Sequence, residues 1–254
     1  MQAEPIWIPY CGPAPPPELW LSRWNFDPVL WAALALLAFA FWRPQAHSHG
    51  MPHRNPLRWA WALTALLYVS PLCALSSAFF TVRVVHHMAL VLVLAPLLAF
   101  GLEPWLRRVP MPLWTCTALA AVAFWTWHVP PPYAAAMSSV AAYALMQFTI
   151  LGSGLAFWVA VRRSSPAQAL AAILVTMVLM GLLGALITFA TRPLYAPHFA
   201  STLAWGVAPL EDQQLAGIVM WAPGSIAYLF TAMWIGWRWM RIERDRRRLR
   251  VEPA

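Results

Sequence analysis

Long apolar runs separated by short arginine-bearing loops dominate this sequence. Seven such runs lie at residues 28–42, 57–80, 82–101, 111–128, 135–161, 167–189 and 213–239. A helix needs about 20 apolar residues to cross a bilayer, and only the first run is clearly shorter. Charged residues make up 10% of the chain, against about a quarter in soluble domains. We therefore predict an all-α integral membrane protein built as a seven-helix transmembrane bundle.

The positions of these runs also predict the domain organisation. Residues 1–27 form an N-terminal segment, 28–240 the transmembrane domain and 241–254 a basic tail. The third run contains Pro96 and the last contains Pro223 in its interior. Such breaks are tolerated in membrane helices when neighbouring groups satisfy the freed carbonyls.

The arginines predict the orientation of the bundle. They concentrate in the loops after the first, third and fifth runs and in the tail, and the alternate loops carry few. Because positive residues accumulate on the cytoplasmic side, the N-terminus is predicted outside and the C-terminus in the cytoplasm. The tail is expected to contact anionic lipid and not nucleic acid. The chain has no lysine, which excludes a retinal protein that needs a lysine Schiff base.

Candidate ligands gather near the side predicted to be outside. His86 and His87 lie about 6–8 Å below the outer end of the third run. His128 ends the fourth run, Asp212 precedes the seventh, and Met220 lies about two turns deeper than Asp212. Ionisable groups inside a membrane usually mark functional sites. Imidazole, carboxylate and thioether together suit copper, whereas imidazole alone also suits zinc or haem.

These residues also have structural interpretations. A histidine near a helix end can simply hydrogen-bond a neighbouring helix, which is the preferred interpretation of His86, and Asp212 can be an N-terminal helix cap. Consecutive residues of a helix point about 100° apart, so His86 and His87 face different surroundings. Arg83, one turn earlier, is expected to hold an anionic partner such as Asp212. Gln213 is a supporting residue at the same level.

The cysteines share no CxxC spacing, and two of the three lie in apolar runs, which argues against a disulfide framework. Cys11 is a candidate soft ligand for Cu(I) on the outer side. Cys73 is expected to be a buried, inert thiol. The tract HSHGMPH at residues 47–53 has a metal-like composition but is expected to be a solvated turn.

Four segments carry a family resemblance: VRVVHHMALVLVLAPLLAFG, WHVPPPYAAA, LLGALITFATRPLYAPHF and APLEDQQLAGIVMWAPG. They resemble the multi-span CtaG family of cytochrome c oxidase assembly proteins, associated with caa(3)-type oxidase, across residues 60–240. The resemblance implies a multi-pass protein of the bacterial cytoplasmic (inner) membrane. It also implies a chaperone that handles copper on the periplasmic side for a haem–copper oxidase and has no enzymatic turnover. Its partners would be oxidase subunits or other copper chaperones.

The resemblance also implies roles for individual residues. The family's glutamine–histidine pair falls on His86 and His87, so His87 is the family-type histidine. A histidine–proline element of the family falls on His128. The family's DQQ and MW motifs contribute Asp212 and Met220.

Some positions depart from the family pattern. Arg83 and Gln147 stand where many relatives have histidine, and Ala134 replaces an aspartate. Tyr133 and Tyr195, from the matching segments, are expected to support the site. With fewer imidazoles than relatives, the chain is expected to bind copper with a reduced ligand set or to serve as a scaffold.

The leading hypothesis is an oxidase assembly factor in which His87 and His128 bind copper, with Asp212 and Met220 completing the site. A haem b electron-transfer protein is an alternative, but it requires two histidines at the same depth. We expect His87 and His128 to differ in depth by several ångströms. A copper permease is a further alternative, although a pore requires polar residues along its whole length. The cytoplasmic halves of the runs are nearly all apolar.

Overall fold

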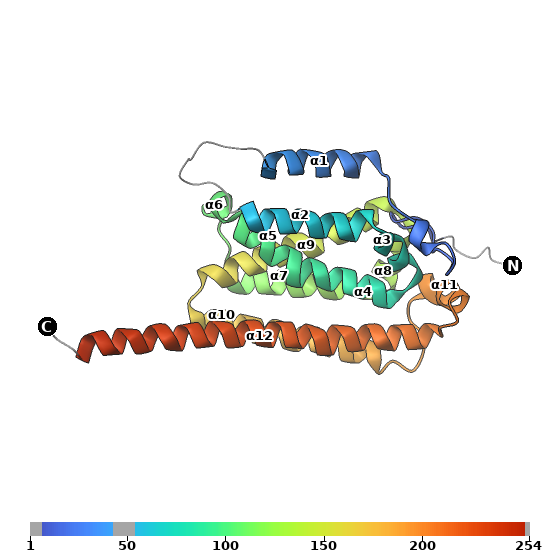
Figure 1. The fold of residues 1–254 in the computed structure, drawn as a ribbon. Helices are drawn as coiled ribbons and strands as arrows, with labels where there is room; N and C mark the ends of the chain where they lie inside the picture. Colours follow the sequence, from blue (N-terminus) through green and yellow to red (C-terminus); the bar gives the residue numbers. More distant parts are fainter. Residues whose placement is uncertain (1–6, 43–53, 252–254) are drawn as a thin grey trace.

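The computed structural model describes residues 7–42 and 54–251, with side chains described as far as residue 247. Every regular element in these residues is a helix (Figure 1). The predicted all-α fold is therefore confirmed for the described part of the chain. The histidine tract at residues 47–53 and the first six residues lie outside it.

The apolar runs fall on seven helical segments. Four of them are long and apolar enough to cross a membrane. They are the continuous segment formed by α4 (Phe80–Ala89), the π-helix η2 (Leu90–Leu94) and α5 (Ala95–Gly101), together with α9 (Val140–Arg163), α10 (Pro166–Thr188) and α12 (Pro209–Val251).

The remaining segments are bent or short. Helices α2 (Arg54–Val69) and α3 (Pro71–Ala78) meet at a bend of 53° and together would give a fifth span. Helices α1 (Pro28–Trp42) and α7 (Leu113–Thr126) are apolar but shorter. Helix length thus supports four or five spans among the described residues, and the count of seven stays a prediction.

Two serines divide runs that the sequence pattern leaves continuous. Ser70 ends α2, and its hydroxyl accepts a hydrogen bond from the backbone N–H of Leu72 in α3. Ser139 has an extended backbone and caps α9 in the same way, through the N–H of Ala142. The predicted run 135–161 is therefore two helices, because a serine that caps a new helix competes with continuation of the old one.

The two ends of the bundle differ. One end, called here the α8–α11 end, carries η1 (Trp20–Ser22), α3, α8 (Pro130–Ser138), η3 (Ala196–His198) and α11 (Phe199–Ala204). The opposite end, called the α6 end, carries α6 (Glu103–Leu106) and the last turns of α12 (Figure 1). The predicted tail continues α12 as a helix to Val251. At 1.5 Å per residue, α12 is about 64 Å long, roughly twice the thickness of a hydrocarbon core.

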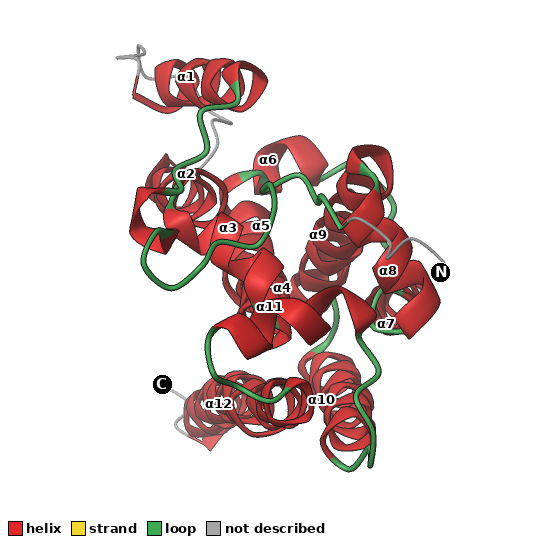
Figure 2. Ribbon diagram, turned by 90° about the vertical axis from the view of Figure 1, so that its right-hand side faces the viewer, coloured by secondary structure: helices red, strands yellow, loops and turns green. Residues whose placement is uncertain are grey.

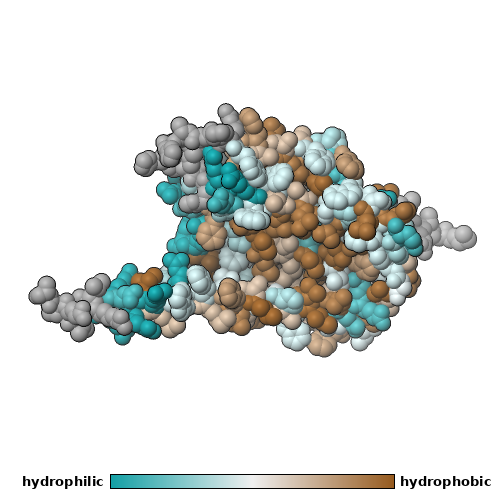
Figure 3. Space-filling model, in the orientation of Figure 1, coloured by the Kyte–Doolittle hydropathy of each residue, from teal (hydrophilic) through white to brown (hydrophobic). Residues whose placement is uncertain are grey.

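The helices around the middle of the bundle expose apolar side chains. Leu36, Phe148, Val178 and Phe230 are all more than 60% exposed. Figure 3 shows hydrophobic residues along the length of the bundle and hydrophilic residues towards its two ends. Figure 2 shows α1 standing apart from the other helices, with α2 as its neighbour. So much exposed apolar surface is typical of a protein that lies in a membrane.

Close backbone approach joins α10 to α12, the most extensively packed helix pair. A Cβ atom built on Gly184 would lie 2.8 Å from the carbonyl oxygen of Gly217. One built on Gly217 would lie 2.6 Å from the carbonyl oxygen of Gly184. Small residues of this kind let membrane helices approach each other closely.

Candidate functional site

The structure brings two candidate ligands, His87 and His128, into contact. His87 lies in α4, and His128 follows the C-terminal end of α7. The Nδ1 atom of His87 is 3.5 Å from Nε2 of His128, and the ring centroids are 5.2 Å apart. The two side chains are 0% and 2% exposed. This contact does not require the two histidines to lie at the same depth, and the expected difference of several ångströms stays a prediction.

Hydrogen bonding determines where the protons of this histidine pair lie. The Nδ1 atom of His128 is 2.6 Å from the carbonyl oxygen of Phe124, an atom that only accepts, so this nitrogen carries the proton. The Nε2 of His128 is then a lone-pair acceptor, and the facing Nδ1 of His87 is its donor. His87 Nε2 is left as a buried lone pair with no hydrogen-bond partner among the described residues.

Asp212 does not join the histidine pair. Its carboxylate accepts hydrogen bonds from the backbone N–H groups of Phe80 at 2.7 Å and Thr81 at 3.1 Å. The Thr81 hydroxyl donates to the carbonyl oxygen of Asp212 at 2.7 Å. Asp212 therefore caps α4 from α12, where the N-cap residue Phe79 makes no side-chain cap bond. A carboxylate at a helix N-terminus is favoured by the helix dipole.

Arg83 is completely buried and pairs with a tyrosine. Its Nη1 donates to the hydroxyl of Tyr143 at 2.7 Å, and the guanidinium carbon lies 4.9 Å from the centre of that ring. Its Nε and Nη2 have no hydrogen-bond partner within the described chain. The expected pairing of Arg83 with Asp212 is wrong, because the Asp212 carboxylate is taken up by the amides of α4.

His86 faces a different set of neighbours from His87, as expected for adjacent residues of a helix. Its ring lies edge-to-face against Tyr68 in α2, with centroids 4.9 Å apart. The Tyr68 hydroxyl donates to Gln147 in α9 at 2.8 Å. Tyr68 and Tyr143 were missed by the sequence reasoning. The available signal was helical spacing, because Tyr143 lies one turn before Gln147 on the same face of α9.

Aromatic residues form the wall between the histidine pair and the α8–α11 end. The ring of Phe80 stacks on Tyr195 at a centroid distance of 3.6 Å. Tyr195 donates its hydroxyl proton to the carbonyl oxygen of His128 at 2.8 Å, and so supports His128 through the backbone. Tyr133 bonds Nε2 of His198 at 2.6 Å. Burial, assisted by the charge of Arg83, lowers the pKa of His198 to about 3.

Gln213 and Met220 are two further candidates, and both lie in α12. Gln213 accepts a hydrogen bond from the N–H of Leu194 at 2.6 Å and donates to the carbonyl oxygens of Ile187 and Arg192 at 3.3 and 3.4 Å. Its amide therefore holds the turn that follows α10. Met220 is completely buried in α12.

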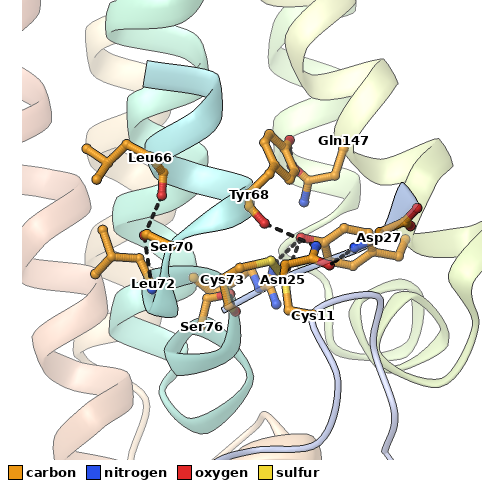
Figure 4. The surroundings of a disulfide bond; sticks show 12 residues. Cys11, Asn25, Asp27, Leu66, Tyr68, Ser70, Leu72, Cys73, Ser76 and Gln147 are labelled. Carbon is orange, nitrogen blue, oxygen red and sulfur yellow. Dashed lines mark hydrogen bonds between the residues drawn. A yellow bond between two sulfur atoms is a disulfide. The ribbon is translucent and has the colours of Figure 1, made fainter. Parts of the chain in front are cut away.

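Cys11 and Cys73 form a disulfide bond (Figure 4). Their Cα atoms lie 5.3 Å apart because the N-terminal segment folds over α3. Asn25 anchors this segment, since its side-chain amide donates to the carbonyl oxygen of Tyr68. The expectations of an inert thiol at Cys73 and of no disulfide are therefore wrong. In the disulfide form Cys11 has no thiolate to offer a metal.

The site in the described chain is a pair of imidazoles and not a larger cluster. No group of three or more His, Cys, Asp or Glu side chains in these residues could hold a metal ion. Two nitrogen ligands with bonds of about 2.0–2.1 Å and a tetrahedral angle lie roughly 3.3 Å apart. The separation of 3.5 Å between His87 and His128 is close to this value.

The comparisons with known proteins identify the family. The family model described as cytochrome c oxidase caa3 assembly factor (Caa3_CtaG) matches residues 35–242. This match includes α4, α7 and α12, the helices that position His87, His128 and Asp212. No curated protein and no solved structure matches the chain significantly. The chain belongs to the CtaG family of cytochrome c oxidase caa3 assembly factors.

Proposed function

We propose that this assembly factor carries copper as cargo, bound between His87 and His128, for the copper centre of a haem–copper oxidase. The observation that supports this most is the facing pair of imidazole nitrogens, 3.5 Å apart and supplied by separate helical segments. Buried nitrogen ligands suit a copper ion, and a small ligand set favours its transfer to a partner. The chain would bind and hand over the ion without catalysing a reaction.

The surroundings of His128 fit a metal ligand. The carbonyl of Phe124 holds the proton on Nδ1 and turns the lone pair of Nε2 towards His87. Hydrogen bonds of this kind to the second ring nitrogen orient metal-bound histidines in proteins. For both facing nitrogens to bind, His87 must move its proton from Nδ1 to Nε2, which has no hydrogen-bond partner among the described residues.

We further propose the topology in which this site works. The chain crosses the bacterial cytoplasmic membrane seven times, with the α8–α11 end on the periplasmic side. The distribution of arginine over alternate loops supports this orientation. The histidine pair would then lie near the periplasm, where the chain would meet oxidase subunits or other copper chaperones.

The contact within the histidine pair argues against the haem alternative. A haem iron with two axial imidazoles lies between them, with the porphyrin filling the gap. Here the ring centres of the pair are 5.2 Å apart and Phe124 stacks on the His128 ring at 4.4 Å, so the packing around the pair leaves no space for a porphyrin. A visible spectrum of the purified protein with no Soret band is the expected result.

Copper binding by purified protein tests the proposal. We expect the wild type to bind Cu(I) in competition with a chromophoric chelator, and His87→Ala and His128→Ala to lose that binding. His86→Ala is the matched control, because His86 is the adjacent buried imidazole and contacts Tyr68 instead of His128. Equal binding by the wild type and both ligand variants would exclude the pair as the copper site. In cells, deletion of the chain should leave the oxidase short of copper.

A further inference from the structure

A second feature, at the α6 end, is independent of the histidine pair. A groove of about 930 Å³ lies between α12 and the helices α5, α9 and α10. Its volume is within the range of about 300–1,000 Å³ that is common for small-molecule sites. Figure 1 shows that α12 runs on past the other helices at this end.

The lining of the groove changes character along α12. Five residues at four-residue spacing form a row along α12 that lines the groove: Phe230, Trp234, Arg238, Ile242 and Arg246. The row is aromatic where it lies against the bundle and becomes cationic towards the helix end. From Phe230 to Arg246 it extends about 24 Å, which is close to the thickness of one leaflet with its headgroups.

A third arginine approaches from the opposite wall. Arg162, near the end of α9, donates to the carbonyl oxygen of Ala99 at 2.5 Å and lies 4.0 Å from the ring centre of Phe100. Both contacts fix the guanidinium at the groove, where it is joined by Arg238 and Arg246 from α12. No acidic side chain lines the groove.

None of the three groove arginines forms an ion pair within the described chain. The ion pairs found there are Arg107 with Glu103 and Arg247 with Glu243, and neither pair lines the groove. The charge of Glu103 also acts on Arg162. An excess of cationic side chains at the groove attracts an anionic group from outside the chain. The part of the groove wall formed by Leu92, Pro96 and Trp158 is apolar and suits a hydrocarbon chain.

We propose that this groove binds one anionic phospholipid. The phosphate lies between Arg162, Arg238 and Arg246, and an acyl chain extends along Phe230 and Trp234 towards Leu92. Charge complementarity favours this ligand over a zwitterionic lipid, because a zwitterionic headgroup brings its own cation to the cluster. Basic pockets between membrane helices bind anionic headgroups in this way. The site does not depend on copper binding.

Retention of lipid by the purified protein tests the proposal. Full-length protein in mild detergent is mixed with phosphatidylglycerol or phosphatidylcholine, and bound lipid is measured by native mass spectrometry. The test variant is Arg238→Gln with Arg246→Gln. The matched control is Arg244→Gln with Arg247→Gln, which removes the same charge from residues of α12 that do not line the groove. We expect binding of phosphatidylglycerol to fall about tenfold or more in the test variant and to stay near wild type in the control.

Three outcomes would overturn the proposal. Equal loss in both double variants would mean that the basic helix attracts lipid only through its overall charge. Equal binding of the two lipids would remove the role of the phosphate charge. A photoreactive residue in place of Ile235, on the groove wall, should crosslink to lipid, and a crosslink to a protein in membranes would identify a protein occupant instead.

Discussion

At the residue scale, Asp212 looks like a metal ligand in the sequence, but in the structure it caps a helix. Its carboxylate joins α12 to the first turn of α4 through two backbone amides. Asp212 therefore helps to position α4, the helix that carries His87, but forms no hydrogen bond with His87 itself. A sequence pattern can place an acidic residue at the correct depth, but the amides that it bonds are 131 and 132 positions away. Such long-range partners are set by tertiary packing.

Substitution of Asp212 separates the two interpretations. We expect Asp212→Asn to lower the free energy of unfolding by about 1–3 kcal/mol, because a charged acceptor of two amides is lost. The number of Cu(I) ions bound should stay at the wild-type value. Thermal unfolding in detergent and copper titration measure the two effects. Glu211→Gln is the control, since the neighbouring Glu211 is exposed and accepts a hydrogen bond from the N–H of Ala208 at 3.2 Å. Loss of copper without loss of stability would restore Asp212 as a ligand.

His198 gives the protein a pH-dependent stability. Burial is the main cause that lowers its folded-state pKa to about 3, whereas the unfolded chain has the usual value of about 6.5. Between these values the unfolded state binds a proton that the folded state does not. The stabilising effect is therefore complete above pH 6.5 and is lost as the pH falls towards 3.

We expect the wild type to lose more thermal stability between pH 7 and pH 5 than the variant His198→Gln. The glutamine can still bond Tyr133 but has no proton to take up in this range. Melting temperatures of the two proteins at both pH values measure the difference. An identical pH dependence would mean that His198 does not titrate on unfolding.

At the element scale, the apolar runs locate the helices because hydrophobicity is a local property of the chain. The same pattern does not reveal that Ser70 and Ser139 each cap a new helix, or that η2 is a π-helix inside a continuous span. These breaks depend on competition between local hydrogen bonds and neighbouring helices. The sequence does predict that His87 and His128 belong to one site, and the structure brings them into contact.

The close approach of α10 and α12 can be tested with a single methyl group. We expect Gly217→Ala to destabilise the protein by about 1–3 kcal/mol, because the new Cβ would meet the carbonyl of Gly184. Gly236 lies on the same helix, and a Cβ added there would have no atom within 4 Å. The effect of Gly236→Ala should be neutral or slightly stabilising, by up to about 1 kcal/mol, because alanine favours helix. Equal effects of the two substitutions on the melting temperature would contradict the packing interpretation.

At the scale of the whole molecule, the disulfide between Cys11 and Cys73 ties the N-terminal segment to the bundle. It closes a chain segment with a sequence separation of 62. We expect Cys11→Ser with Cys73→Ser to lower the stability by about 2–4 kcal/mol, mainly because the unfolded chain gains freedom. Cys116→Ser leaves this crosslink intact and is the control. A double variant as stable as the wild type would mean that the crosslink adds nothing to the folded state.

The same disulfide reports the orientation of the molecule in the cell. Disulfides form in the bacterial periplasm and are rare in the cytosol. If the α8–α11 end faces outward, Cys11 and Cys73 should be joined in the native membrane. Rapid alkylation of living cells, followed by reduction and a second alkylating label, distinguishes thiols from disulfides. We expect Cys11 and Cys73 to carry the second label. Cys116 is a free but buried thiol, so it should carry the first label once the protein is unfolded in the first reagent. The first label on all three cysteines would place the N-terminal segment in the cytoplasm and reverse the proposed topology, and with it the periplasmic location of the histidine pair.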